Sequence, residues 1–147
     1  MDNLLLHKLL GCIAGRTAPF SIQVAGISML PVIANGQTVC FQKKESYKTG
    51  DNILFLYKND ELIVHRLLRI EGGIYYCKGD NAFRIEDVRP ERILGVALLE
   101  EDANNTPEFI RDSWEIGQLF HRLKYDKAAV LLTDEYREYK LKYLQSL

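Results

Sequence analysis

The stretch GISMLP, residues 26–31, separates two runs of strand-forming residues. The run before it is SIQV at 21–24, and the run after it is TVCF at 38–41. Because glycine and proline favour a turn, the chain is expected to leave one strand here and enter another, with Ser28 between them. A serine in this place is either an ordinary turn residue or a nucleophile held at the end of a strand.

Short strand-like runs continue from residue 20 to residue 101. β-Branched, aromatic and other apolar residues are divided by turn-forming Gly, Asn and Asp, and the turns KND and EGG indicate hairpins. The later runs lie at 53–57, 62–70, 74–77 and 93–99. This spacing predicts a mainly β (α+β) fold built on an antiparallel barrel or folded sheet.

The first residues predict a short amphipathic helix. Five apolar side chains recur there at helical spacing: Leu5, Leu6, Leu9, Leu10 and Ile13. The apolar run is much shorter than the roughly 20 residues that a membrane span needs. A secretory signal would place a basic residue before this run, where the chain has Asp2. We expect the helix to pack on the body of the protein, with peripheral contact to a membrane as the alternative.

The polar linker at 100–107 ends the β region. Thr106 and Pro107 are typical of a helix start, and the following apolar residues predict a helix to about Lys124, with another beginning near Thr133. The chain is therefore expected to have three parts: an N-terminal helix (1–18), a β-rich core (19–103) and a C-terminal helical extension (104–147).

Composition argues against several classes of function. Lysine and arginine number 19 against 20 acidic residues, so the net charge of −1 gives no electrostatic case for nucleic acid. The cysteines (Cys12, Cys40 and Cys77) show no CxxC spacing and no pairing with histidine, so we expect no metal or other cofactor. Their odd number is typical of a reducing compartment, and we expect a cytoplasmic location.

Residues that serine catalysis requires occur within the β region. This chemistry needs a hydroxyl nucleophile, a base for its proton, a group that orients the base and N–H donors for the oxyanion. Ser28 lies in the turn. His65 lies in an apolar run with Ile63 and Leu67 on its face, where burial favours the neutral imidazole that accepts a proton. Taken singly, such residues are more often structural than catalytic, and spacing alone does not show that they meet.

Four boxes occur in an order that resembles the superfamily of signal peptidases and self-cleaving repressors. They are SMLP at 28–31, GDNILF at 50–55, IVHR at 63–66 and KGDN at 78–81. The match is closest to the branch that uses a Ser-His pair, as in the endoplasmic-reticulum and archaeal types of signal peptidase. The resemblance covers about residues 20–100 and implies a coiled antiparallel β-barrel core. The C-terminal third has no recognised counterpart.

The resemblance also implies catalytic roles. Ser28 would be the nucleophile, and His65 would be the general base, where bacterial signal peptidases and repressors have lysine. Asp80 matches the aspartate of the Gly-Asp-Asn box. Asp87 matches a second family aspartate only with a small shift, and Glu86 competes with it for that place.

Three further positions are expected to face the substrate or the oxyanion: Gly26, Met29 and Pro31. The backbone N–H of Ser28 would donate to the oxyanion. Relatives often have a hydroxyl-bearing or small residue two positions before the nucleophile. This chain has Gly26 there, which offers no side-chain donor.

The implied activity is that of a serine endopeptidase that works through an acyl-enzyme. The chain has no membrane span before the serine box, so we expect a soluble enzyme that cleaves a precursor or leader peptide. The resemblance suggests a preference for small side chains beside the cut, and the C-terminal helices are expected to bind substrate or a protein partner.

Two other interpretations stay open. The chain could be a catalytically weak or inactive peptide-binding or scaffold module that works with a partner, although the joint presence of Ser28, His65 and Asp80 argues against it. It could also be a self-cleaving switch, for which only the termini and the linker at 101–107 offer a cleavable segment.

Overall fold

The β region forms one sheet of seven strands. The computed structural model describes residues 18–145, so the predicted N-terminal helix falls almost wholly outside the described residues. The strands are β1 (Phe20–Gln23), β2 (Thr38–Gln42), β3 (Asn52–Tyr57), β4 (Glu61–Glu71), β5 (Ile74–Lys78), β6 (Glu86–Val88) and β7 (Ile93–Ala97). Short 3₁₀ turns, η1 (Lys58–Asp60) and η2 (Pro90–Arg92), precede β4 and β7.

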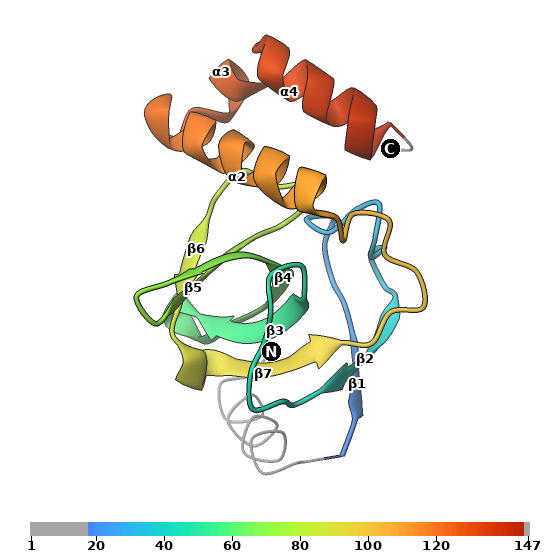
Figure 1. The fold of residues 1–147 in the computed structure, drawn as a ribbon. Helices are drawn as coiled ribbons and strands as arrows, with labels where there is room; N and C mark the ends of the chain where they lie inside the picture. The colour runs from blue at the N-terminus through green and yellow to red at the C-terminus, as the bar shows by residue number, and fades with distance from the viewer. Residues whose placement is uncertain (1–17, 146–147) are drawn as a thin grey trace.

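The strand order is β1-β2-β7-β3-β4-β5-β6, and every neighbouring pair is antiparallel. The sheet curls strongly, as Figure 1 shows, so the predicted mainly β fold with an antiparallel folded sheet is confirmed. The β3–β4 and β4–β5 hairpins turn at the two predicted places. The three-residue strand β6 was not predicted from the sequence.

Alternation along the strands sorts apolar side chains into two buried clusters. On β4, Val64 packs with Met29 and Leu54 in one cluster, whereas Ile63 and Leu67 pack with the other cluster. Both faces of β4 are therefore covered, each by one of the two clusters. This burial fixes the register, and with it the direction in which His65 points.

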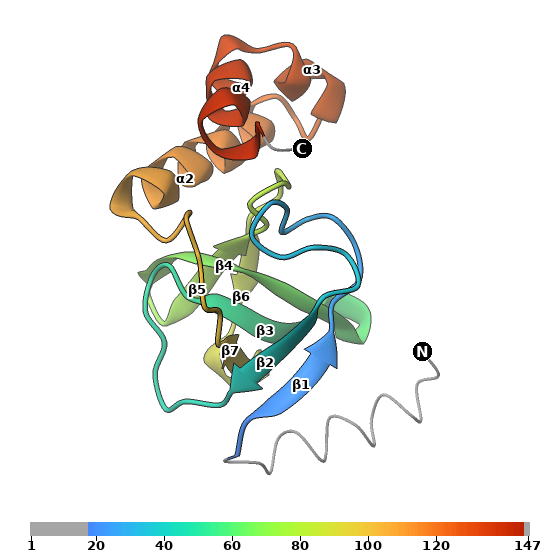
Figure 2. The same cartoon turned by 90° about the vertical axis from the view of Figure 1, so that its right-hand side faces the viewer.

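The C-terminal helices pack together against one side of the curled sheet (Figure 2). They are α2 (Pro107–Arg122), α3 (Lys127–Leu131), α4 (Asp134–Tyr139) and a π-helical end, η3 (Lys140–Leu144). Thr106 caps α2 as predicted, since its side chain accepts a hydrogen bond from the N–H of Phe109 at 3.1 Å. Phe109 is fully buried and contacts the ring of Tyr143 edge-to-face, with the ring centroids 4.8 Å apart.

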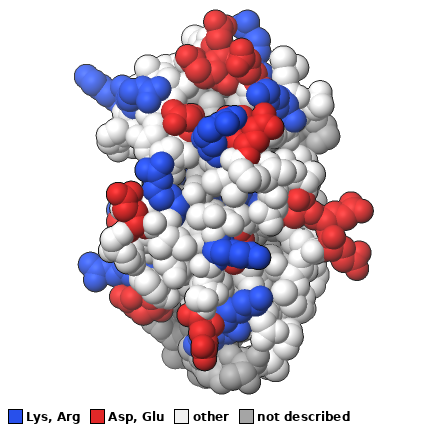
Figure 3. All heavy atoms as spheres, viewed as in Figure 1, with Lys and Arg blue, Asp and Glu red and all other residues white. Residues whose placement is uncertain are grey.

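Acidic and basic side chains are interspersed on the face shown in Figure 3. Among residues 18–145, no helix has the length and apolar character needed to cross a membrane.

Candidate active site

Ser28 lies in the loop between β1 and β2, and the loop is fixed at several points. Gly26 adopts a φ of 100°, which favours glycine, and its N–H donates to the side chain of Asn35 at 2.8 Å. Met29 is only 2% exposed and packs in the core, which anchors the residue next to the serine. The loop therefore holds Ser28 in one place.

His65 reaches Ser28 from β4. Its Nε2 lies 3.0 Å from the Oγ of Ser28, within hydrogen-bond distance. The imidazole is mostly buried and contacts the ring of Phe55 edge-on, with the centroids 6.4 Å apart. The sequence predicted that Ile63 and Leu67 share the face of His65, and both pack in the same buried cluster as Phe55.

Glu86 contacts the other nitrogen of the same ring. Its Oε1 is hydrogen-bonded to Nδ1 of His65, and its side chain is 1% exposed. Its second oxygen, Oε2, is buried and has no hydrogen-bond partner among residues 18–145. A carboxylate in this position favours the tautomer with the proton on Nδ1, so that Nε2 can accept the serine proton.

The two aspartates named from the sequence lie elsewhere. Asp87 follows Glu86 on β6, and strand alternation points it outward, where it accepts a 3.4 Å hydrogen bond from Tyr57. Asp80 is fully buried, and its carboxylate binds the guanidinium of Arg66 through two hydrogen bonds of 2.9 and 2.8 Å. Assigning either aspartate to His65 is therefore a wrong prediction, and the third candidate, Glu86, occupies that place.

Arg66 explains why Asp80 is buried. It follows His65 on β4, so its side chain leaves the opposite face of the strand, where Asp102 also binds it at 2.8 and 2.9 Å. Burial alone would lower the pKa of Arg66, but hydrogen bonds to the two aspartates outweigh burial and raise it. Asp80 therefore neutralises a buried cation.

Gly79 allows the serine loop and His65 to come together, a role that was not predicted from the sequence. Asn81, two residues after Gly79, donates its N–H to the carbonyl of Ser28 at 2.8 Å and its side-chain amide to the carbonyl of Ile27 at 3.2 Å. A Cβ on Gly79 would lie 2.6 Å from the Ser28 carbonyl oxygen and 2.9 Å from Nε2 of His65. Only glycine fits between them without displacing one of the two.

Comparison with protein families gives a match over residues 8–98 to the family described as Peptidase S24-like. The chain belongs to the peptidase S24-like family. No curated protein and no solved structure gives a match. The matched region contains the loop of Ser28, strand β4 with His65 and strand β6 with Glu86. Helices α2, α3 and α4 lie beyond it.

The C-terminal helices of this S24-like protein nevertheless contact the loop beside the site. Tyr139 donates to the backbone carbonyl of Asp80 at 2.6 Å, and Gly117 of α2 lies so close to Ile85 that a Cβ would come within 2.4 Å of that side chain. Lys78 is fully buried and donates to Ser113 of α2 at 2.8 Å. Burial lowers the pKa of Lys78 to about 7.

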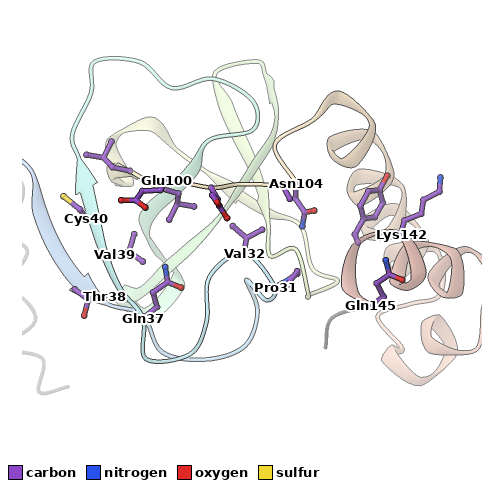
Figure 4. A pocket seen from close by; sticks show the side chains of 15 residues that line it. Pro31, Val32, Gln37, Thr38, Val39, Cys40, Glu100, Asn104, Lys142 and Gln145 are labelled. Atoms are coloured by element: carbon purple, nitrogen blue, oxygen red, sulfur yellow. The ribbon is translucent and has the colours of Figure 1, made fainter.

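Ser28 and His65 open into a pocket of about 690 Å³. Gly26 lines it. Met29 does not, because it is in the core, and Pro31 lines a different pocket of about 780 Å³ (Figure 4). That larger pocket lies between β2, the segment after β7 and the end of η3, and it contains neither Ser28 nor His65. Among residues 18–145 no cluster of His, Cys, Asp or Glu could hold a metal ion.

Proposed function

We propose that this protein is a serine endopeptidase in which Ser28 is the nucleophile and His65 is the general base. The observation that carries the proposal is the line of hydrogen bonds from Ser28 Oγ through His65 to Glu86. A hydroxyl beside an imidazole that is itself oriented by a carboxylate is the arrangement that activates serine in unrelated proteases. Glu86 is a positioning residue, because it acts through His65.

The proposed reaction follows from these positions. Ser28 Oγ attacks the carbonyl carbon of a peptide bond while Nε2 of His65 takes the hydroxyl proton. The tetrahedral intermediate collapses, the C–N bond breaks, and His65 returns the proton to the leaving amine. Water then attacks the acyl-enzyme ester, giving its proton to His65, and the serine leaves with that proton restored.

The oxyanion would be stabilised by the backbone. Within residues 18–145 the N–H of Ser28 forms no hydrogen bond, so it is available as a donor. Gly26 has no side chain, and a Cβ built on it would meet nothing within 4 Å. The extended substrate therefore has room beside the nucleophile, while the chain supplies no side-chain donor from that position.

The substrate we propose is a precursor or leader peptide bound in extended form. The Ser-His pairing supports placing the chain near the branch of signal peptidases that uses histidine, rather than with lysine-dependent relatives. We propose no part for a metal or other cofactor, since each step above uses only Ser28, His65, Glu86 and water. A cytoplasmic setting, with or without peripheral membrane contact, is part of this proposal.

The alternative is a peptide-binding module of the same fold that has lost useful catalysis. The missing side-chain donor at Gly26 favours it, because fewer donors for the oxyanion would slow acylation. A binding module needs the pocket but not the contact between Ser28 and His65. The two functions therefore differ in the reactivity of one hydroxyl.

A serine-directed fluorophosphonate probe separates the two functions. The native protein and the Ser28→Ala and His65→Ala variants are treated between pH 6 and pH 9, and intact mass and peptide mapping give the modified residue. The proposal predicts a single adduct on Ser28 of the native protein. Native protein that labels no faster than Ser28→Ala at every pH would leave the binding module as the function.

A further inference from the structure

The pocket that contains Ser28 and His65 is completed by residues outside the S24-like match. Phe120 at the end of α2, Tyr125 after it and Lys127 at the start of α3 all line it, although the family match ends at residue 98. The C-terminal helices therefore supply a wall of the site itself.

This wall is aromatic and ordered. Phe120 lies between two other rings, with centroids 5.7 Å from Phe83 and 5.3 Å from Tyr125. The hydroxyl of Tyr125 is hydrogen-bonded to Nδ1 of His121 at 2.6 Å, which holds the ring in place. Tyr125 is still 60% exposed, so much of its ring is available to a bound molecule.

An apolar side chain next to the nucleophile also lines the pocket. Ile27, directly before the nucleophile, is 61% exposed. An isolated exposed isoleucine needs no explanation, but this one lines the same pocket as the aromatic wall and Ser28. A pocket of about 690 Å³ with this lining has far more room than a small side chain fills.

The charges around the pocket are mainly positive. Its charged lining residues are Arg84, Lys127 and Glu86. The Glu86 carboxylate is buried against His65, whereas Arg84 and Lys127 are exposed. The guanidinium of Arg84 lies over the ring of Tyr57, 5.1 Å from its centroid. A bound peptide therefore meets two cations and no free carboxylate in this pocket.

We infer that the C-terminal helices select the substrate: a peptide with a bulky apolar side chain near the scissile bond and an acidic residue close to it. The bulky side chain contacts Ile27 and the aromatic wall, and the acidic group faces Lys127 and Arg84. This inference rests on the proposed function and changes its expected specificity, because the family resemblance alone suggested small side chains.

A library of random dodecapeptides tests the inference. The native protein is first labelled with the fluorophosphonate to establish that Ser28 is reactive, and unlabelled enzyme is then incubated with the library. Cleavage sites are read by mass spectrometry. We expect Phe, Tyr, Trp, Leu or Met to be enriched at one fixed position and Asp or Glu at another.

Two variants and one control tie the specificity to the helices. Tyr125→Asn removes the ring, and asparagine tolerates the φ of 62° at this position. It should reduce the preference for bulky over small side chains by about 2- to 10-fold. Lys127→Glu should reduce the preference for acidic residues by about 2- to 5-fold. Lys140→Glu makes the same charge change on an exposed residue that does not line the pocket, and it should leave both preferences unchanged.

The outcomes separate this inference from the proposed function. Labelling of Ser28 together with cleavage beside small side chains only would overturn the inference and leave the endopeptidase intact. Labelling of Ser28 without cleavage of any library peptide would also overturn the inference. The library contains peptides that carry a bulky apolar residue and an acidic residue at every spacing. Absence of labelling would overturn both. Equal specificity in native protein, Tyr125→Asn and Lys127→Glu would show that the helices do not select the substrate.

Discussion

The carboxylate of Glu86 is hydrogen-bonded to Nδ1 of His65, on the side of the ring away from Ser28. The neighbouring Asp87 points outward from the same strand. Of these two, only Glu86 can therefore orient the base. Removing the charge of Glu86 is expected to slow catalysis, whereas removing the charge of the adjacent Asp87 is not.

Glu86→Gln should lower the rate of serine acylation by about 100-fold or more, because an amide no longer favours the reactive tautomer of His65. Asp87→Asn should leave that rate within about 2-fold, since Asp87 is exposed and contacts Tyr57 only weakly. The second-order rate of fluorophosphonate labelling measures both variants. An equal loss in the two variants, or a larger loss in Asp87→Asn, contradicts the assignment of Glu86.

Asp80→Asn should lower the free energy of unfolding by roughly 2–5 kcal/mol, because Arg66 stays buried with one of its two carboxylate partners missing. The measurement is equilibrium urea unfolding, with Asp87→Asn as the control for loss of one negative charge. If the two variants unfold at the same urea concentration, Asp80 does not have the stabilising role described above.

Gly79→Ala should lower acylation by about 100-fold or more, since the new Cβ would push Ser28 and His65 apart. Gly72→Ala is the control for adding a methyl group: its φ of 58° disfavours alanine, but its Cβ would meet nothing within 4 Å. The control therefore loses stability without losing reactivity. Normal labelling of folded Gly79→Ala would show that the close approach at Gly79 is not needed.

Lys78 predicts a pH dependence of stability. Its pKa is about 7 in the folded protein against an ordinary 10.5, so between these values the unfolded chain binds a proton that the folded chain does not. Stability must then rise with pH in this window, by up to about 1.4 kcal/mol per pH unit. The gap in the free energy of unfolding, native protein minus Lys78→Met, should become more positive from pH 7 to pH 9 in urea unfolding. A gap that is constant with pH would mean that Lys78 stays charged when buried.

Local sequence signals predicted much of this architecture. Thr106 and Pro107 give the start of α2, and the apolar runs give six of the seven strands. Strand β6 was missed because EDV carries two acids in three residues. The signal was nevertheless there: Glu86 and Val88 are two positions apart, so if Val88 is in the core, Glu86 faces inward as well.

The remaining contacts depend on packing between segments far apart in the chain. The burial of Lys78 against Ser113 follows from how α2 lies on the sheet. The contact of Asp80 with Arg66 follows from the pairing of β4 with β5, in which Arg66 lies opposite Lys78. A single sequence does not contain that relationship in any local pattern. The same is true of Phe120 and Tyr125, which reach the pocket only through the fold of the C-terminal helices.

The claim that His65 is the base for Ser28 is tested most directly by the second-order rate constant for labelling of Ser28 in native protein and in His65→Gln. Circular dichroism first establishes that the variant is folded. If His65 takes the proton of Ser28, the rate constant should fall by about 100- to 10,000-fold. A folded His65→Gln protein that labels on Ser28 as fast as native protein would contradict the claim that these two residues form the catalytic pair.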